Sequence, residues 1–273
     1  MKTSLVAGAI AGMLAASVPA SAQLLDGVKA ADIAPIAGVI ADGARWEIAW
    51  AGPMTADGMA TSPEGHVLFA QEQSNSVRRL WPDGSEWVAV PYVPGAGAGS
   101  VEPSGRVLAV ERTCTDPGLG LADCAVPTRV VQLAPERRVI ASSFADGSSL
   151  GRLNDLEADG RGGAWFTQGA LYHAAADGSV TKVADAENFT NGLALSPDGA
   201  TLYVTDRTKI LAFDISENGT VHNQRVFATL SQDTQGFGGD GIFGTEDDVL
   251  VEGDPENPVS PTAVGAFRTD HAF

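Results

Sequence analysis

Short apolar stretches alternate with polar turns along most of this chain, and two neighbouring stretches repeat one unit. The first runs from Arg152 to Thr167 and reads R-L-N-D-L-E-A-D-G-R-G-G-A-W-F-T. The second runs from Thr190 to Asp206 and reads T-N-G-L-A-L-S-P-D-G-A-T-L-Y-V-T-D. Each has an Asn, an apolar strand, a D-G-type turn and a second apolar strand that reaches a Thr. Several short strands per unit, at a spacing of about forty residues, are typical of β-propeller blades.

Weaker copies of this unit lie on either side of the pair. Residues 56–84 alternate apolar and polar positions around an E-G and a D-G turn, as half-buried strands do. Residues 99–113 form a further copy, and the run G-G-D-G-I, which contains Asp240, matches the start of a fifth. We therefore predict an all-β fold of the β-propeller type that spans residues 23–235 and has about five recognisable blades.

Residues 236–273 do not continue the pattern. Acidic residues gather here among Gly and Pro, and no apolar alternation follows Val251. Such a composition predicts an irregular, acidic and disordered tail. The alternative interpretation is a cation-binding loop in D-G-I-F-G-T-E-D-D, although this run lacks the D-x-D-x-D-G order of an EF-hand.

Residues 1–22 have the pattern of a cleaved secretory signal peptide. A basic start is followed by an apolar run from Leu5 to Val18 and by the small-residue site P-A-S-A, which ends at Ala22. The apolar run is too short and too rich in Ala and Gly to anchor the chain in a membrane. We predict cleavage after Ala22 and a secreted or periplasmic mature protein.

Charge and composition narrow the classes of function. The chain has 17 Lys and Arg against 34 Asp and Glu, which gives a formal net charge of −17. Such a charge repels nucleic-acid phosphates and anionic membranes, and it favours cations. The residues after the signal are enough for one sizeable domain with its own core. We expect a monomer with no further membrane span and no nucleic-acid partner.

The two cysteines, Cys114 and Cys124, stand in one short loop, E-R-T-C-T-D-P-G-L-G-L-A-D-C. Because an exported protein meets an oxidising compartment, a disulfide between them is the leading interpretation. It would pin the loop and contribute roughly 2–3 kcal/mol in the chain-entropy model. Two free thiols or a metal pair are the alternatives, and the spacing without a neighbouring His disfavours zinc.

Asn154 and Asn191 hold the same place in the two clear units. In a propeller the first strand of each blade lines the central channel, so equivalent positions point toward one another across it. Amide oxygens that converge there are hard ligands, suited to Ca²⁺ or Mg²⁺. Asp57 and Asp240 take the same place in their units. The alternative is that Asn starts these strands through its local hydrogen bonds in turns.

The runs R-L-N-D, with its following D-G and W-F-T, and N-G-L-A-L-S-P-D-G-A-T-L-Y-V-T-D resemble the regucalcin, gluconolactonase and luciferin-regenerating enzyme family. The resemblance extends over roughly Ala51 to Asp240. It implies a six-bladed propeller with one divalent cation at the mouth of its channel. We expect Ca²⁺, with Zn²⁺, Mg²⁺ and Mn²⁺ as alternatives. The resemblance also implies hydrolysis of lactones or of closely related esters.

The same resemblance assigns roles to individual residues. Glu111 and Arg112 fall where the family places polar residues that face the substrate. Asp240 falls on the metal-binding aspartate that serves as general base. The implied metal ligands are Asp57, Asn154, Asn191 and Asp240.

The chain also departs from the family pattern. The family usually has Glu where this chain has Asp57, which is shorter by one methylene group. No sequence remains for a sixth blade, and the run from Gly239 to Pro258 looks like a segment of large secreted bacterial proteins of other kinds. The predicted propeller is therefore incomplete, and Asp240 belongs either to its fifth blade or to a foreign segment.

Three functions follow from these observations. The first is an exported, divalent-metal-dependent hydrolase of small-molecule lactones or esters. The second is a propeller that binds a ligand or a protein without catalysis, and the third is an inactive truncated member of the family. The sequence holds no G-x-S-x-G, no H-E-x-x-H and no phosphate loop, so no nucleophile or zinc-protease motif competes with the first. His66 and His173 lie in strand-like runs, where we expect structural roles.

Overall fold

A computed structural model describes residues 35–37, 40–44, 49–52, 54–113, 127–185, 190–206, 209–229, 234–236 and 249–251. The chain divides into two compact units, residues 1–51 and 52–273. In the first unit, the described residues include an antiparallel bridge between Ile36 and Ile40. The predicted signal peptide lies outside the described residues, and the rest of this section concerns the second unit.

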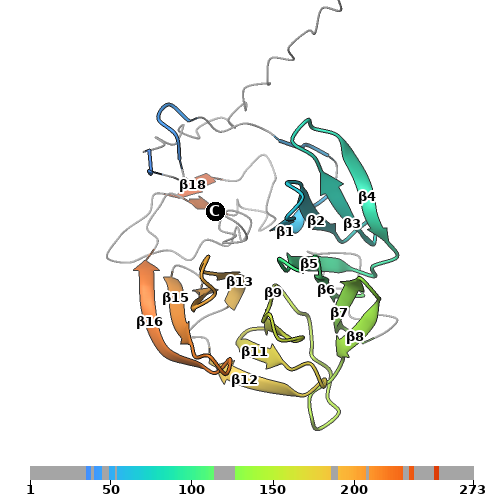
Figure 1. Ribbon diagram of the computed structural model, residues 1–273, viewed down its shortest axis with the longest axis vertical. Helices are drawn as coiled ribbons and strands as arrows, with labels where there is room; N and C mark the ends of the chain where they lie inside the picture. Colours follow the sequence, from blue (N-terminus) through green and yellow to red (C-terminus); the bar gives the residue numbers. More distant parts are fainter. Residues whose placement is uncertain are drawn as a thin grey trace, which may run out of the picture. The chain divides into compact units, whose positions relative to one another are not determined.

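The second unit contains four antiparallel sheets, each made of four consecutive strands. The first strand of each sheet lies innermost in Figure 1, and neighbouring inner strands contact each other. Blade 1 consists of β1 (Asp57–Thr61), β2 (Val67–Gln71), β3 (Ser76–Leu80) and β4 (Glu86–Pro91). Blade 2 consists of β5 (Ala96–Val101), β6 (Val107–Glu111), β7 (Arg129–Ala134) and β8 (Arg138–Ala141).

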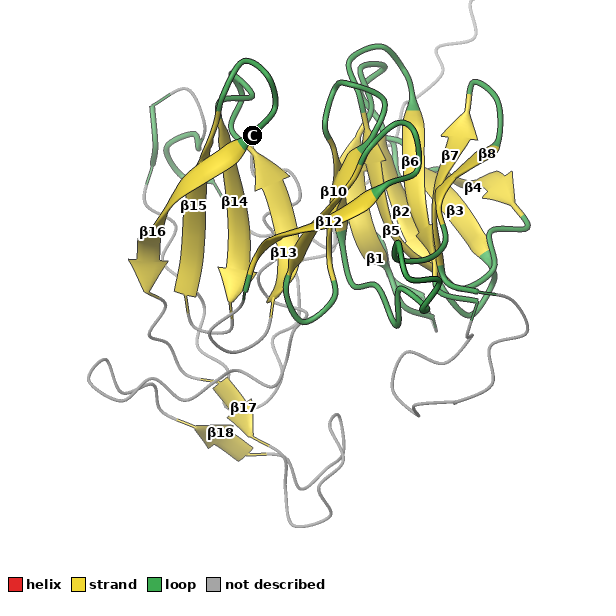
Figure 2. Ribbon diagram, turned by 90° about the horizontal axis from the view of Figure 1, so that it is seen from below, coloured by secondary structure: helices red, strands yellow, loops and turns green. Residues whose placement is uncertain are grey.

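The next two blades come from the pair of clear sequence units. Blade 3 consists of β9 (Leu156–Ala158), β10 (Ala164–Thr167), β11 (Leu171–Ala174) and β12 (Val180–Ala184). Blade 4 consists of β13 (Thr190–Leu195), β14 (Thr201–Asp206), β15 (Lys209–Ile215) and β16 (Val221–Thr229). β17 (Thr234–Gly236) pairs with β18 (Val249–Val251) in a separate two-stranded sheet. Figure 2 shows strands and loops and no helix among the described residues.

The turns explain why each unit folds into hairpins. Gly65 and Gly199 have φ values of 83° and 69°, in the left-handed region that glycine enters without strain. Each closes its turn with a backbone hydrogen bond to the carbonyl oxygen of Ser62 or Ser196. The D-G-type dipeptides therefore end one apolar run and start the next, which produces the meander of short strands.

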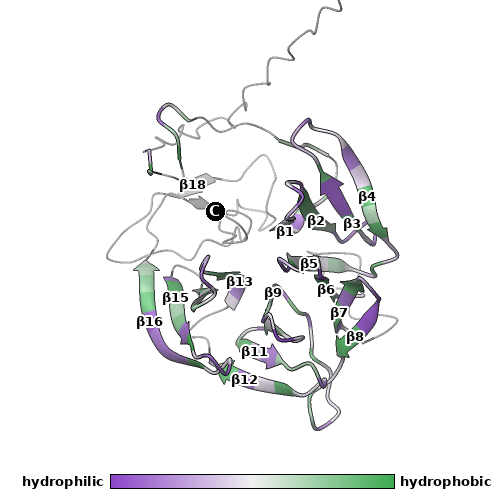
Figure 3. Ribbon diagram, viewed as in Figure 1, coloured by the Kyte–Doolittle hydropathy of each residue, from purple (hydrophilic) through white to green (hydrophobic). Residues whose placement is uncertain are grey.

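The core lies between successive blades, because each sheet buries its apolar face against the next sheet. One apolar cluster joins blades 1 and 2, one joins blades 2 and 3, and one joins blades 3 and 4. All four residues of β10, A-W-F-T, are buried, whereas the outer strand β16 is mostly exposed. Figure 3 shows the end of β16 as hydrophobic, and there Val226 and Phe227 are exposed.

The structure confirms the predicted all-β propeller architecture. Four blades are present among the described residues, and the predicted start of a fifth, at Asp240, lies outside them. No helix long and apolar enough to cross a bilayer occurs in the described part of the chain.

Candidate functional site

Three of the four blades can be aligned residue for residue through their first turns. Gly65, Gly105 and Gly199 each donate the backbone N–H to the carbonyl oxygen three residues earlier, at 2.8 or 2.9 Å. In each of these three blades, the same number of residues separates the glycine from the start of the inner strand. In blade 3, the sequence repeat places Asn154 at the equivalent position. We call the four the inner-strand positions, and they are Asp57, Gly97, Asn154 and Asn191.

A second set of equivalent residues lies at the end of the next strand. Counting forward by one fixed number of residues from the same glycines reaches Glu72, Arg112 and Asp206, which we call the following-strand positions. β1 and β2 are antiparallel, as are β5 and β6 and β13 and β14, so the end of the second strand lies beside the start of the first. Both sets therefore lie at one end of the channel, which we call the mouth.

Arg112 joins three blades at the mouth. Its Nε donates to the carbonyl oxygen of Leu153 at 2.6 Å, and its Nη2 donates to that of Asn154 at 2.6 Å. Its Nη1 donates to Oδ2 of Asp57 at 3.1 Å and to Oε2 of Glu72 at 3.2 Å. The side chain is only 5% exposed, so a positive charge is buried here and fixed by charge-assisted bonds.

Glu72 is the buried partner of this arginine. Its side chain is 1% exposed, and it also accepts Nη2 of Arg152 on both oxygens at 3.1 Å. Burial raises the pKa of the Glu72 carboxyl, against the opposing effect of Arg112 and Arg152. Asp57, Glu72, Arg112 and Arg152 together form a cluster whose formal charges balance.

Asn154 and Asn191 are linked through the backbones of blades 3 and 4. Nδ2 of Asn154 donates to the carbonyl oxygen of Thr190 at 3.4 Å, and Oγ1 of Thr167 donates to that of Asn191 at 2.5 Å. Both asparagines are half-buried. The side-chain amide of Asn191 makes no hydrogen bond to the described residues.

Asp155 fixes the spacing of these two blades. Its side chain is buried, with Oδ1 accepting the N–H of Leu156 and Oδ2 accepting the N–H of Leu193, both at 2.9 Å. A single carboxylate therefore caps the start of β9 and ties it to β13. Sequence reasoning missed this residue and Glu72. Glu72 could have been found, because it stands in the place that Asp206 takes in blade 4.

Glu111 and Arg112 point to different surroundings, as successive residues at a strand end do. Glu111 is fully buried and forms ion pairs with Arg129, at 2.7 Å, and with Arg137, both of blade 2. Arg112 alone of this predicted pair contacts the other residues of the mouth. Cys114, Cys124 and Asp240 lie outside the described residues.

The donor chemistry of the mouth fits a hard divalent cation. Asp57 offers a carboxylate, and Asn154 and Asn191 offer amide oxygens. The described residues contain no group of three or more His, Cys, Asp or Glu that could hold a metal ion. Among the described residues, a cation at the mouth would use the amide oxygens of Asn154 and Asn191 and would share the carboxylate of Asp57 with Arg112.

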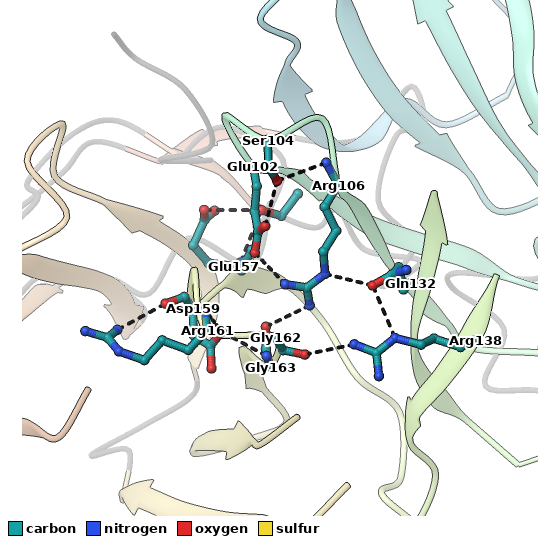
Figure 4. A network of polar contacts seen from close by, with 12 residues as sticks. Glu102, Ser104, Arg106, Gln132, Arg138, Glu157, Asp159, Arg161, Gly162 and Gly163 are labelled. Carbon is teal, nitrogen blue, oxygen red and sulfur yellow. Dashed lines mark hydrogen bonds and ion pairs between the residues drawn. The ribbon is translucent and has the colours of Figure 1, made fainter. Parts of the chain in front are cut away.

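The opposite end of the channel holds a different polar network, shown in Figure 4. Nη1 of Arg106 donates to Glu102 at 2.6 Å, and Nε of Arg106 donates to Gln132 at 2.9 Å. Asp159 accepts the N–H groups of Arg161 at 2.7 Å and Gly163 at 2.8 Å. A cavity of about 400 Å³ opens here, and its lining includes Glu102, Pro103, Glu157, Asp159, Arg161 and Trp165.

His173 belongs to this second network. Its Nε2 lies 2.8 Å from Oδ2 of Asp159, and its ring packs near Trp165. His66 is buried and packs against Trp81 in blade 1. Neither histidine is among the residues found at the mouth, in keeping with the structural roles expected for them.

Comparison with known proteins matches part of the chain to a family. The model of the SMP-30/gluconolactonase/LRE-like region matches residues 118–252. A gluconolactonase from Xanthomonas campestris shares 21% identity at a TM-score of 0.52; the match covers 66% of this chain and 64% of that one. A structural-genomics target assigned to the gluconolactonases shares 17% identity at a TM-score of 0.56, over 80% of this chain and 84% of the other.

These likenesses establish the fold. The chain spans less than two thirds of the Xanthomonas enzyme, and both identities are low. A calcium-binding regucalcin from Agrobacterium tumefaciens matches at 19% identity and a TM-score of 0.45, over 64% of this chain and 59% of that one. The part of the chain from residue 118 to residue 252 matches the SMP-30/gluconolactonase/LRE-like family.

Proposed function

We propose that this protein is an exported, divalent-metal-dependent hydrolase of lactones or related esters. The observation that supports the proposal is that Asp57, Asn154 and Asn191 take equivalent places at the mouth, where Arg112 bonds to Asp57 and to the backbone of Asn154, and the amide of Asn154 bonds to Thr190, the residue before Asn191. The family match of residues 118–252 supports the reaction class, and two structural neighbours are assigned as gluconolactonases. The cation we propose is Ca²⁺, and the complete propeller we propose has six blades.

We assign the following roles to the residues of the proposed site. Asp57, Asn154 and Asn191 would hold the cation, with Asp240 as the fourth ligand. When bound, a divalent cation polarises an ester carbonyl and lowers the pKa of water. Asp240 would take the proton from the attacking water as general base. Arg112 would orient the substrate from within the mouth, whereas Glu111 is fully buried in ion pairs of blade 2 and is left out of this role.

Calcium titration by calorimetry, with hydrolysis of a lactone panel, tests the metal and the reaction together. Asn191→Ala should weaken Ca²⁺ binding at least tenfold, about 1.4 kcal/mol, because it removes one amide ligand. Asn218→Ala is the matched control, since Asn218 is exposed in the turn between β15 and β16. Equal Ca²⁺ affinity in Asn191→Ala and wild type would contradict the assigned ligand set.

The role of Asp240 needs its own variant. Asp240→Asn should keep much of the Ca²⁺ affinity, because an amide oxygen can still coordinate the ion. It should abolish lactone hydrolysis, because an amide cannot accept the proton. Full activity in Asp240→Asn would remove Asp240 from the mechanism and leave the metal site standing.

A second candidate is a propeller that binds a ligand without catalysis. The observation that favours it is the contact between Arg112 and Asp57, which engages the described carboxylate of the proposed metal site. Ca²⁺ binding without turnover of any lactone in the panel would establish this second function.

Export is proposed from the first residues of the sequence. Mass spectrometry of the protein recovered from the periplasm or medium should show a mature chain that begins at Gln23. A chain that retains Met1 to Ala22 would refute this cleavage.

The proposed disulfide follows from export. Thiol labelling of the unfolded, unreduced protein should leave Cys114 and Cys124 unlabelled. Two labelled cysteines would show that the thiols are free.

A further inference from the structure

Blade 2 is the one described blade with no side chain at its inner-strand position. Asp57, Asn154 and Asn191 fill that position in the other three, and Gly97 takes it here. A Cβ built on Gly97 would lie 2.2 Å from Nε of Arg112 and 2.4 Å from its Cζ. Arg112 therefore fills the space that a ligand-bearing side chain fills in the neighbouring blades.

The guanidinium of Arg112 is held there rigidly. It donates to acceptors from blade 1 (Asp57 and Glu72) and to two carbonyl oxygens just before β9. A planar fork with five donors can make several such bonds at once, which an ammonium group cannot do with the same geometry. Because the side chain is 5% exposed, water screens its charge poorly.

Within the cluster of Asp57, Glu72, Arg112 and Arg152 the formal charges balance, and the buried Asp206 at the same end of the channel is a further carboxyl group outside this cluster. Two carboxylates, Asp57 and Glu72, face two guanidinium groups, Arg112 and Arg152. A divalent cation that approaches Asp57 meets the fixed positive charge of Arg112 a few ångströms away. At such separations in a partly buried site, repulsion between like charges is substantial.

We propose that Arg112 sets the affinity of the mouth for divalent cations. It acts as the built-in counter-ion of Asp57, so that a cation binds only in competition with the guanidinium. The inference rests on the metal site of the proposed function, because it concerns the same carboxylate. Gly97 is the residue that makes room for this arrangement.

Calorimetric titration with Ca²⁺ alone tests the proposal. Arg112→Gln removes the positive charge and keeps a polar side chain, and its Ca²⁺ affinity should rise at least tenfold above wild type. Arg225→Gln is the matched control, because Arg225 is an exposed arginine paired with Asp214 on blade 4. It changes the net charge equally, and its Ca²⁺ affinity should equal that of wild type.

Two further variants keep the test decisive. Arg112→Gln leaves the buried Glu72 with Arg152 as its remaining ion-pair partner among the described residues, which can prevent folding. The double variant Glu72→Gln with Arg112→Gln avoids this and conserves net charge, and it should show the same gain in Ca²⁺ affinity. Adding Asp57→Asn to Arg112→Gln should abolish the gain in Ca²⁺ affinity, because the carboxylate for which Ca²⁺ and Arg112 compete is then absent.

The possible results separate the inference from the proposed function. Unchanged or weaker Ca²⁺ binding in the Arg112 variants, with binding by wild type, would overturn the inference and keep the metal site. Binding by the Arg112 variants alone would support the inference and refute a metal-dependent activity of the wild type. Absence of Ca²⁺ binding in every variant would overturn both.

Discussion

The two ends of the propeller channel are both polar, but their central charged residues, Asp159 and Arg112, are held by different kinds of contact. At the turn end, Asp159 is satisfied by backbone N–H groups and His173 of its own blade. At the mouth, Arg112 bonds to residues 40 to 55 positions away, in two other blades. The carboxylate of Asp159 is thus held by nearby residues, although Arg106 and Arg161 at the same end also donate to carbonyl oxygens of neighbouring blades. The guanidinium of Arg112 is held only where three blades meet.

This difference indicates where a bound ligand can change the separation of the blades. Hydrogen bonds within one turn persist whether or not the neighbouring blade moves. Bonds between blades depend on blade separation, so a ligand that binds beside Arg112 can shift that separation more than a ligand that binds beside Asp159. Function in such a fold is expected where the contacts are between blades, as the proposed metal site is.

The largest expected change in stability comes from removing the charge of Arg112 at the mouth. Arg112→Met should lower the free energy of unfolding by about 3–5 kcal/mol, because Glu72 loses a buried charged partner. Urea denaturation of the purified protein measures the loss. Glu72→Gln combined with Arg112→Met should recover much of it. A loss below 1 kcal/mol would show that the mouth does not hold the blades together.

The turn end should give a smaller and pH-dependent effect. Burial by itself raises the pKa of Asp159, but hydrogen bonds from His173, Arg161 and Gly163 outweigh it and hold the pKa below the ordinary value of 3.8. The ionised carboxylate therefore contributes stability above that value, and the contribution is lost as pH falls through the lower folded-state pKa.

Asp159→Ala should consequently lower the free energy of unfolding by about 2–3 kcal/mol at pH 7, since three hydrogen bonds lose their acceptor. Denaturation at pH 3 and below should show a smaller difference between variant and wild type. Asp177→Ala, in an exposed turn of the same blade, is the control and should change stability far less. If the difference in unfolding free energy between Asp159→Ala and wild type grew toward low pH, it would contradict the stabilising role assigned to the ionised Asp159.

Gly97 and Gly99 of β5 provide a comparison within one strand. Gly97→Ala should destabilise the protein by about 1–2 kcal/mol, because its Cβ collides with the clamped Arg112. At Gly99 the nearest atom would lie 3.5 Å from the new Cβ, an ordinary contact, so Gly99→Ala should change stability by less than about 1 kcal/mol. Thermal unfolding of both variants measures the contrast, and equal effects would mean that Arg112 moves aside freely.

The smallest effect is expected at an ion pair that belongs to neither end. Arg225 and Asp214 are partly exposed on blade 4, 2.6 Å apart. Arg225→Gln should change the free energy of unfolding by at most about 1 kcal/mol, because solvent screens such pairs. A loss as large as that of Arg112→Met would show that burial does not separate the two kinds of arginine.

The sequence predicted the parts of the fold that depend on local chemistry. The blades around Asn154 and Asn191 were found because alternation and D-G-type turns act over a few residues. Blade 2 was a weaker prediction, because Gly97 stands where the repeat has Asp or Asn. The contact between Arg112 and Glu72 could not be predicted, since 40 residues separate them and only the packing of blade on blade brings them together.

The long reach of Arg112 also has a consequence for the order of folding. Each blade is four consecutive strands, so its hairpins can form from neighbouring residues as soon as they are available. The bonds of Arg112 close loops of 40 to 55 residues, and such loops close late because their entropy has to be overcome first. The mouth therefore assembles after blades 1 and 2 and the segment that leads into blade 3. We therefore expect Glu72 and Arg112 to remain hydrated until these blades dock, and their burial to accompany the docking of blade on blade.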